Sequence, residues 1–268
     1  MLAAAVRALG VRPGATVMFH TRMSALGHVV GGADAVILGL QDAVGPQGSL
    51  MAVTGWADNT YGMEDWPDAA RSLYLAEMPA FDPRVSSSDP DVGRLPERLR
   101  TWPGALRSAH PESSMAVLGP AAAFITTPHQ HTVDGFGAGT PLARLVESNG
   151  QVLMLGAPLE TITLLHHAES IANAGPQIRV RYPMPVLEDG QRVWRDYQDI
   201  NSSEGAYDYS RYVPAGVDPF EFLGRAALAA GVGRSGLVGQ GLSHLFEARA
   251  LVAFAVAWLE ERFPRHAG

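Results

Sequence analysis

Short apolar runs alternate with segments of helical periodicity along most of the chain. The apolar runs have the length of buried strands, and they are Ala15–His20, Ser49–Trp56, Ser113–Leu118 and Gln151–Gly156. Apolar positions three and four residues apart predict helices, and these are Leu2–Leu9, Ala33–Val44, Ala121–Thr127, Pro141–Ser148 and Glu160–Ala174. Such alternation favours βαβ units. We therefore predict a single mixed α/β domain, residues 1–268, around a central, largely parallel sheet.

The pattern changes in two parts of the chain. Asp58–Pro103 is rich in Pro, Asp, Ser and aromatic residues and has little periodicity, which is typical of a long functional loop. After Gln177, two β-like runs, Ile178–Val186 and Arg192–Tyr197, flank an Asp189-Gly190 turn signal and predict a hairpin. The predicted C-terminal region then consists of a helix at Pro219–Ala230, a glycine-punctuated segment at Gly231–Leu245 and a helix at Ala248–Phe263.

Composition excludes several classes of chemistry. The chain contains no Cys, which excludes thiolate nucleophiles, disulfides and Cys-based zinc or iron–sulfur sites. Its net charge is −7 without a basic cluster, so we expect no nucleic-acid partner. An acidic chain suits a cationic partner, although this charge is also ordinary for a protein of this length. No apolar run approaches the roughly 20 residues that cross a bilayer, and the N-terminus lacks the pattern of a signal peptide. We therefore expect a cytoplasmic protein with no membrane partner.

The segment ETITLLHHAESIANA carries the most informative polar pair. On a helix, His166 and Glu169 lie on the same stripe as the apolar residues Ile162 and Leu165. A buried carboxylate needs a partner, so the two side chains should hydrogen-bond or face a cavity. A histidine held by a carboxylate is a standard arrangement for general-base catalysis. A structural His–Glu pair in the core is an equally good interpretation of these residues alone.

A metal site is a further, less favoured interpretation of the histidines. His167, or the pair His129 and His131, could supply nitrogen ligands beside His166 and Glu169. Adjacent helical residues such as His166 and His167 point in different directions, and the HExxH spacing is absent. No metal is therefore expected.

Three loops could hold an anionic or extended ligand. Thr21–Gly32 follows the strand Ala15–His20, and ligands of open α/β sheets bind at the carboxyl ends of strands. Arg107–Pro111 precedes a strand, and Gly135–Pro141 ends in a Thr-Pro signal for a helix start. Each loop could equally be structural, and the first matches neither a P-loop nor a GxGxxG motif.

Together these segments resemble the aminoglycoside 3-N-acetyltransferase family, also called the antibiotic N-acetyltransferase family. The matching blocks are Val6–His20, Met23–Gly32, Phe81–Pro83, Arg107–Pro120, Gly137–Pro141 and Gln151–Glu169. The last block, QVLMLGAPLETITLLHHAE, is the strongest. Several blocks in order at matching separations are much more specific than any single motif.

The resemblance implies transfer of the acetyl group of acetyl-CoA to the 3-amino group of the 2-deoxystreptamine ring of aminoglycosides, which inactivates these antibiotics. It implies that His166 is the catalytic histidine and Glu169 its carboxylate neighbour. It also implies a set of CoA-binding residues, namely His20, Thr21, Arg22, Met23, Arg107, Ser108, Ala109, Phe136 and Gly137. The family usually continues after the histidine with Ser or Ala and then Ser, so Thr21-Arg22 would add a cation near the pyrophosphate.

The ammonium groups of an aminoglycoside call for acidic partners, and acids gather in the irregular segments. The residues predicted to bind the substrate are Tyr61, Glu64, Asp65, Asp82, Asp196 and Asp199. Without Cys no thioester acyl-enzyme can form, so we expect direct transfer in a ternary complex. Two alternatives stay open: an acetyl-CoA-dependent acyltransferase for another amine, and a non-catalytic protein that binds the drug.

Overall fold

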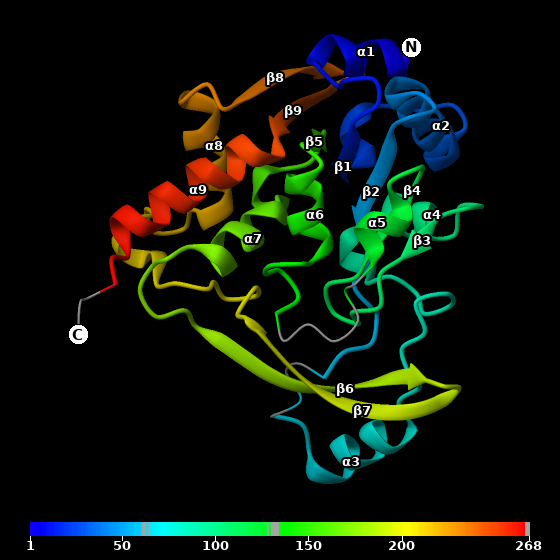
Figure 1. Ribbon diagram of the computed structural model, residues 1–268, viewed down its shortest axis with the longest axis vertical. Coiled ribbons are helices and arrows are strands. Elements are labelled where there is room, and N and C mark those ends of the chain that lie inside the picture. The colour runs from blue at the N-terminus through cyan, green and yellow to red at the C-terminus, as the bar shows by residue number, and fades with distance from the viewer. Residues whose placement is uncertain (61–62, 64, 128, 130–133, 266–268) are drawn as a thin grey trace.

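A seven-stranded mixed sheet forms the centre of the computed structural model, which describes residues 1–60, 63, 65–127, 129 and 134–265 (Figure 1). In spatial order the strands are β3 (Leu106–Arg107), β4 (Met115–Leu118), β2 (Ser49–Val53), β1 (Thr16–Thr21), β5 (Gln151–Leu155), β9 (Gly241–Glu247) and β8 (Gly233–Val238). β1 pairs in parallel with β2 and β5, and the outer pairs are antiparallel. The predicted α/β class is confirmed, and the parallel pairing lies at the centre of the sheet.

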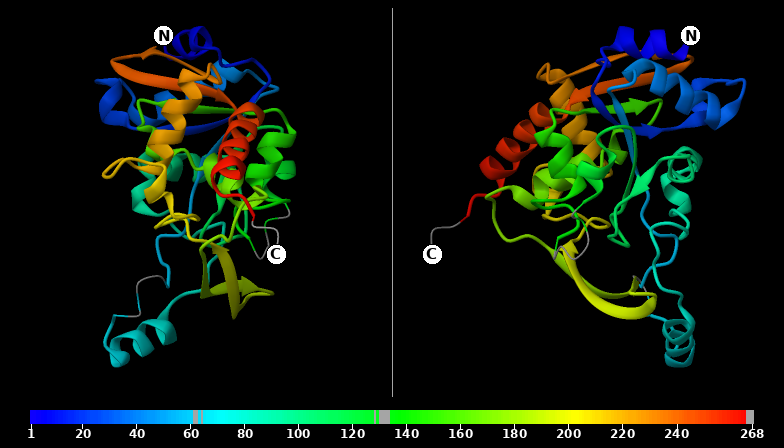
Figure 2. Two further views of the ribbon diagram at one scale, coloured as in Figure 1. Left: turned by 90° about the vertical axis from the view of Figure 1, so that its left-hand side faces the viewer. Right: turned by 45° about the vertical axis from the view of Figure 1, so that its right-hand side comes forward.

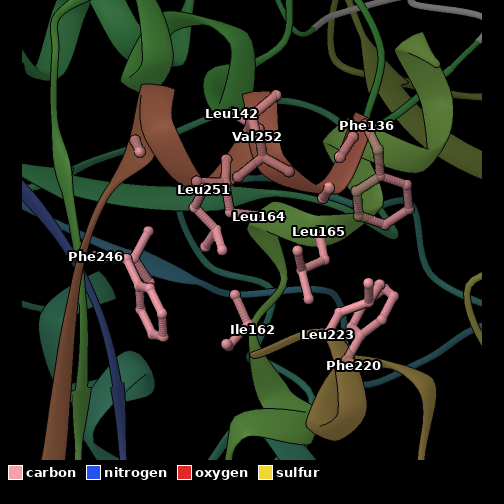
Figure 3. Close-up of a cluster of buried hydrophobic side chains, with 14 of the residues drawn as sticks. Phe136, Leu142, Ile162, Leu164, Leu165, Phe220, Leu223, Phe246, Leu251 and Val252 are labelled. Carbon is pink, nitrogen blue, oxygen red and sulfur yellow. The ribbon is translucent and has the colours of Figure 1, made fainter. Parts of the chain in front are cut away.

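Helices cover both faces of this sheet. One face packs against α1 (Leu2–Leu9), α2 (Gly32–Val44) and α4 (Arg94–Arg100), and the other against α5 (Ala122–Thr126), α6 (Pro141–Glu147), α7 (Leu164–Ile171), α8 (Pro219–Ala229) and α9 (Ala248–Arg262). Successive strand residues point to opposite faces, so Val17 and Phe19 belong to the first core and Met18 to the second. Figure 3 shows the second core. In it, Phe136 of the loop before α6 (the 136 loop, residues 134–140) and Phe220 of α8 lie beside the leucine side chains of α7.

A hairpin and a helix form an arm below the sheet. β6 (Arg179–Glu188) and β7 (Gln191–Ile200) pair only with each other, and α3 (Asp68–Glu77) lies beside them, away from the main sheet (Figures 1 and 2). The hairpin turns at Asp189-Gly190, whose φ angles of 49° and 77° fit a two-residue turn, as predicted. A small separate core that includes Trp56, Phe81 and Tyr197 holds the arm together.

Three expectations about elements are corrected. The segment predicted as an irregular loop over Asp58–Pro103 contains α3, α4 and a 3₁₀ turn at Pro90–Val92. The glycine-punctuated segment Gly231–Leu245 forms β8 and most of β9. The helix predicted from Glu160 starts as a separate 3₁₀ turn, Leu159–Thr161, before α7. For α3 and the β8–β9 hairpin the missing signal was a periodic apolar face, since α3 buries no residue and the hairpin contains several glycines.

None of the helices in the described part of the chain is both long and apolar enough to cross a membrane.

Candidate functional site

The candidate site lies where two adjacent parallel strands send the chain to opposite faces of the sheet. After β1 the chain continues to α2 on one face, and after β5 it continues to α7 on the other. Such a divergence opens a crevice at the carboxyl ends of the strands, where α/β proteins bind ligands. A cavity of about 410 Å³ occupies this position. Its wall includes His20, Thr21, Arg22, Val53, Asp91, Pro96, Pro158, Glu160, Thr163, His166 and Phe220.

His166 and Glu169 form the hydrogen bond that their helical spacing predicted. His166 Nδ1 lies 2.8 Å from Glu169 Oε2. The carboxylate is 1% exposed and the imidazole 15% exposed, so the acid is buried behind the ring that reaches the cavity. An ionised carboxylate only accepts hydrogen bonds, so Nδ1 carries the hydrogen and the lone pair of Nε2 is left for a proton from a ligand.

Buried donors from another segment hold the Glu169 carboxylate. The Tyr209 hydroxyl donates to Oε1 at 2.6 Å, and the Ala206 N–H lies 3.4 Å from the same oxygen. Burial and the neighbouring negative charge raise the pKa of Tyr209, which keeps its hydroxyl protonated as a donor. Together with the His166 bond, these contacts satisfy a carboxylate that would otherwise be costly to bury.

Two phenylalanines fix the plane of the His166 ring. The Phe136 and Phe220 rings lie 4.9 Å and 4.5 Å from the His166 ring, centroid to centroid. The 136 loop is itself anchored, because His167 Nδ1 lies 2.7 Å from the Phe136 carbonyl oxygen. The loop ends at Thr140, whose hydroxyl caps α6 ahead of Pro141, as the Thr-Pro signal predicted.

A second, smaller pocket reaches the same histidine from the other side. Its volume is about 130 Å³, and it shares Glu160, His166 and Phe220 with the larger cavity. Its other walls carry Glu204 and Asp218, so carboxylates surround much of the pocket. His166 therefore stands between a larger cavity at the strand ends and a smaller acidic pocket.

The predicted CoA-binding residues fall into three groups. His20, Thr21 and Arg22 line the larger cavity, whereas Met23 starts a 3₁₀ turn (Met23–Leu26) and packs against the core on the α2 face. Phe136 contacts His166, and Gly137 lies beside it against Ser170.

Arg107, Ser108 and Ala109 are not in the His166 cavity. The Arg107 guanidinium is bonded to the carbonyl oxygens of Thr54 and Ser86, and burial lowers its pKa to about 9. Ser108 Oγ accepts from Met115 N–H and lies 2.8 Å from His129 Nδ1. Ala109 lines a separate pocket of about 200 Å³ beneath the hairpin.

None of the predicted substrate-binding residues that the structure describes lines a pocket that contains His166. Asp82 is paired with Arg84 and lines the pocket beneath the hairpin. Asp199 is buried, accepts from Gly135 N–H and the Tyr182 hydroxyl, and has its pKa raised by burial. Asp65 precedes α3 and Asp196 lies on β7, both on the arm. The remaining two predictions, Tyr61 and Glu64, are outside the described residues.

The acids near His166 were not singled out as site residues from the sequence. Glu160, Glu204 and Asp218 come from three separate segments, and only the fold brings them together. Asp218 had a local signal, since Asp-Pro predicts a helix start, and its carboxylate caps α8 by accepting from Phe220 N–H and Glu221 N–H.

The histidines considered for a metal site have other roles where they are described. His129 is buried between Ser108 and the carbonyl oxygen of Gly135, and His131 lies outside the described residues. Over the residues that the structure describes, no group of three or more His, Asp or Glu side chains is arranged to hold a metal ion.

Comparison with known proteins gives consistent matches over nearly the whole chain. Residues 18–260 match the family described as aminoglycoside 3-N-acetyltransferase. Aminoglycoside N(3)-acetyltransferase VII of Streptomyces paromomycinus is 53% identical over 268 residues, which are 100% of this chain and 93% of that protein. The crystal structure of aminoglycoside acetyltransferase AAC(3)-Xa superimposes with a TM-score of 0.94 at 49% identity, covering 98% of this chain and 92% of that one.

Two further structures of similar proteins contain ligands. AAC-IIIb, a binary complex with CoASH, has a TM-score of 0.88 and 40% identity and covers 98% of this chain and 96% of its own. AAC-VIa, bound to sisomicin, has a TM-score of 0.89 and 37% identity and covers 98% of this chain and 97% of its own. The family predicted from the ordered sequence blocks is thus confirmed, and the chain belongs to the aminoglycoside 3-N-acetyltransferase family.

Proposed function

We propose that this protein transfers the acetyl group of acetyl-CoA to the 3-amino group of the 2-deoxystreptamine ring of aminoglycosides, with His166 as the general base. The observation that carries the proposal is a carboxylate-held histidine between two cavities of different character. Membership of the family and its CoASH-bound and sisomicin-bound relatives support both substrates. Use of acetyl-CoA also agrees with the cytoplasmic location expected from the sequence.

The larger cavity suits the thioester end of acetyl-CoA. It lies at the carboxyl ends of β1 and β5, and its wall offers polar groups with no partner in the described structure. Arg22 is exposed on this wall and forms no ion pair with the described residues. A guanidinium in that position can contact a phosphate, since Arg is well suited to phosphate oxygens.

The smaller pocket suits the cationic acceptor. Glu160, Glu204 and Asp218 give it a negative potential, which favours a polyamine and raises its local concentration. We propose these carboxylates, and not the acids on the arm, as the principal partners of the substrate's ammonium groups.

Four changes complete the reaction. The free amine attacks the thioester carbonyl carbon and loses a proton to His166 Nε2, while Glu169 stabilises the imidazolium that forms. The carbonyl electron pair moves to oxygen, giving a tetrahedral intermediate. Its collapse restores the carbonyl, breaks the carbon–sulfur bond and releases the CoA thiolate. The thiolate then takes the proton back from His166, so the ring returns to its neutral state.

Thiol release from acetyl-CoA with a panel of aminoglycosides tests the proposal. We expect turnover with the wild-type protein, and a loss of at least about 100-fold in kcat for His166→Ala, because a positioned base contributes about 10²–10⁴-fold. Acetylation of another amine in place of every aminoglycoside would favour the acyltransferase alternative. Drug protection that survives His166→Ala would favour sequestration.

A further inference from the structure

Two polar atoms at the end of β1 are buried without a hydrogen-bond partner among the described residues. They are His20 Nε2 and Thr21 Oγ1, and both residues line the cavity that contains His166. Buried polar groups in folded proteins are nearly always bonded, and leaving one unsatisfied costs about 1–3 kcal/mol. Two such atoms side by side at the carboxyl end of the central strand indicate a place where a ligand supplies the missing contact.

Strand geometry places the His20 and Thr21 side chains on opposite faces of the sheet. His20 follows Met18 on the sheet face that packs against α7, whereas Thr21 follows Phe19 on the face that packs against α2. The His20 backbone is also fixed, because His20 pairs with Met154 of β5 and the Arg22 N–H donates to the Leu155 carbonyl oxygen at 3.2 Å. His20 is therefore the residue on the same side of the sheet as the catalytic helix.

His20 and His166 lie in contrasting surroundings. His166 is bonded to a carboxylate, while no described acid or hydroxyl bonds to the His20 ring. Burial lowers the pKa of His20 to about 4, so its ring is neutral at pH 7 and carries one N–H. An imidazole whose pKa is lowered in this way is a poor proton acceptor but a competent hydrogen-bond donor to a carbonyl oxygen, and two groups with such different environments serve different roles.

We infer that His20 donates a hydrogen bond to the thioester carbonyl oxygen of acetyl-CoA and stabilises the negative charge that develops there, while His166 takes the proton. The inference rests on the proposed function and adds a second catalytic histidine to it. No proton leaves His20: the carbonyl electron pair moves to oxygen as the amine bonds to carbon, and it returns when the carbon–sulfur bond breaks. A fixed donor aimed at such an oxygen contributes to catalysis because it needs no reorganisation in the transition state.

The position of the carbonyl band of bound acetyl-CoA tests the hydrogen bond without any turnover. Acetyl-CoA labelled with ¹³C at the carbonyl is bound to each protein, and the difference infrared spectrum is recorded. A hydrogen bond lowers the carbonyl stretching frequency. We expect a lower band in the wild-type complex than in the His20→Leu complex, and partial restoration in His20→Gln, whose amide can donate. His244→Ala is the matched control, because His244 is bonded to Ser235 and lines none of the cavities described above.

Kinetics of the same proteins provide the second measurement. We expect His20→Leu to lower kcat about 100-fold with little change in the KM for acetyl-CoA, as for removal of one oxyanion donor. Identical carbonyl bands in wild type and His20→Leu would overturn the inference, as would a raised KM with unchanged kcat. If Thr21→Val raises the carbonyl frequency and His20→Leu does not, the donor is Thr21 and the inference is overturned.

The two measurements distinguish a wrong proposed function from a wrong role for His20. If the wild-type protein binds acetyl-CoA but acetylates no aminoglycoside, the acceptor assignment is wrong and the band comparison still decides the role of His20. Thermal unfolding of every variant shows whether it is folded. If His20→Leu does not fold, wild type and His20→Gln are compared with Thr21→Val, and a carbonyl band that is the same in all three overturns the inference.

Discussion

His166 depends on its neighbours for its orientation and for its free nitrogen. Glu169 holds Nδ1, Phe136 and Phe220 hold the ring plane, and Tyr209 holds the far oxygen of Glu169. From the sequence, the helical spacing predicted that His166 and Glu169 would bond to each other or face a cavity, and the structure shows the bond. The other contacts come from distant segments, so no local pattern could have revealed them.

Glu169→Gln tests whether His166 needs a carboxylate as its partner or only a polar side chain. An amide can donate to Nδ1 and thereby stabilise the wrong tautomer, so we expect kcat to fall by about 100-fold or more. Tyr209→Phe is the matched variant, since it removes the 2.6 Å bond to Glu169 but leaves the His166 bond in place. Its kcat should fall by less than about 10-fold. Equal losses in the two variants, measured by thiol release, would contradict the role given to Glu169.

The acids of the smaller pocket should determine affinity for the aminoglycoside. We expect Glu204→Gln to raise the KM for the aminoglycoside about 10-fold, because it removes a charge-assisted hydrogen bond from the smaller pocket and not from the larger cavity. The KM for acetyl-CoA should not change. Glu261→Gln, which alters an exposed acid paired with Arg262 on α9, serves as the control and should behave as wild type. An equal rise in both KM values would show that the two cavities do not hold different substrates.

Among the elements, the hairpin β6–β7 and the 136 loop form one unit. Asp199 on β7 accepts from the Gly135 N–H, and Ser113 Oγ donates to the Gly135 carbonyl oxygen at 3.1 Å. The same loop presents Phe136 to the His166 ring. The hairpin therefore supports the site from a distance, although none of its residues lines the His166 cavity.

Gly135→Ala tests how tightly this unit is packed. A Cβ at position 135 would lie 2.1 Å from Ser113 Oγ and 3.0 Å from the His110 ring, so buried groups would have to move. We expect the free energy of unfolding to fall by about 2–4 kcal/mol, as for other overpacked buried sites. At Gly175 the nearest atom to a new Cβ is 3.4 Å away, so Gly175→Ala should lie within about 0.5 kcal/mol of wild type. Urea unfolding measures both, and similar values for the two variants would contradict the prediction.

The elements also show which parts of the fold the sequence could predict. The central strands were predictable because β1, β2 and β5 are short apolar runs buried on both faces. The Asp189-Gly190 turn identified the hairpin. In contrast, α3 lies on the arm and buries no side chain, and α4 has seven residues with Pro96 near its start. A helix without a buried apolar stripe, such as α3, gives no periodic signal, and α4 is too short to show more than one turn of its buried side chains.

Five buried or half-buried histidines couple the stability of the described part of the molecule to pH. Burial lowers the pKa of His20 and of His129 to about 4, and it also lowers the pKa of His110, His167 and His244. Histidine in an unfolded chain titrates near 6.5. Between these values the unfolded chain binds more protons than the folded protein, so the free energy of unfolding decreases as the pH falls. Each histidine contributes a slope of up to about 1.4 kcal/mol per pH unit within this window.

Two acids, the buried Asp199 and the half-buried Glu112, act in the opposite direction. Burial raises the pKa of Glu112 to about 8 and also raises that of Asp199, so the folded protein retains protons that the unfolded chain has lost. Their contribution to stability decreases as the pH rises above the usual carboxyl range, and for Glu112 this continues to about pH 8. The five histidines outweigh the two acids below about pH 6.5, and only the acids act above it. We therefore expect maximal stability near pH 6.5, with a decline on the acid side toward pH 4–5.

Urea denaturation at half-unit intervals from pH 4.5 to 8 measures this profile. His129→Gln should flatten the acid side, because the variant removes one of the rings whose pKa is lowered, while His28→Gln changes an exposed histidine and should leave the slope as it is. The hydrogen bonds of His129 to Ser108 and Gly135 make the variant less stable at every pH, so the slope and not the absolute stability is compared. A stability that is constant from pH 7 to 5 would mean that these rings are solvated or charged in the folded protein. In that case the His20 ring would not be neutral and buried in the folded protein. Another group would then have to donate the hydrogen bond to the thioester carbonyl oxygen.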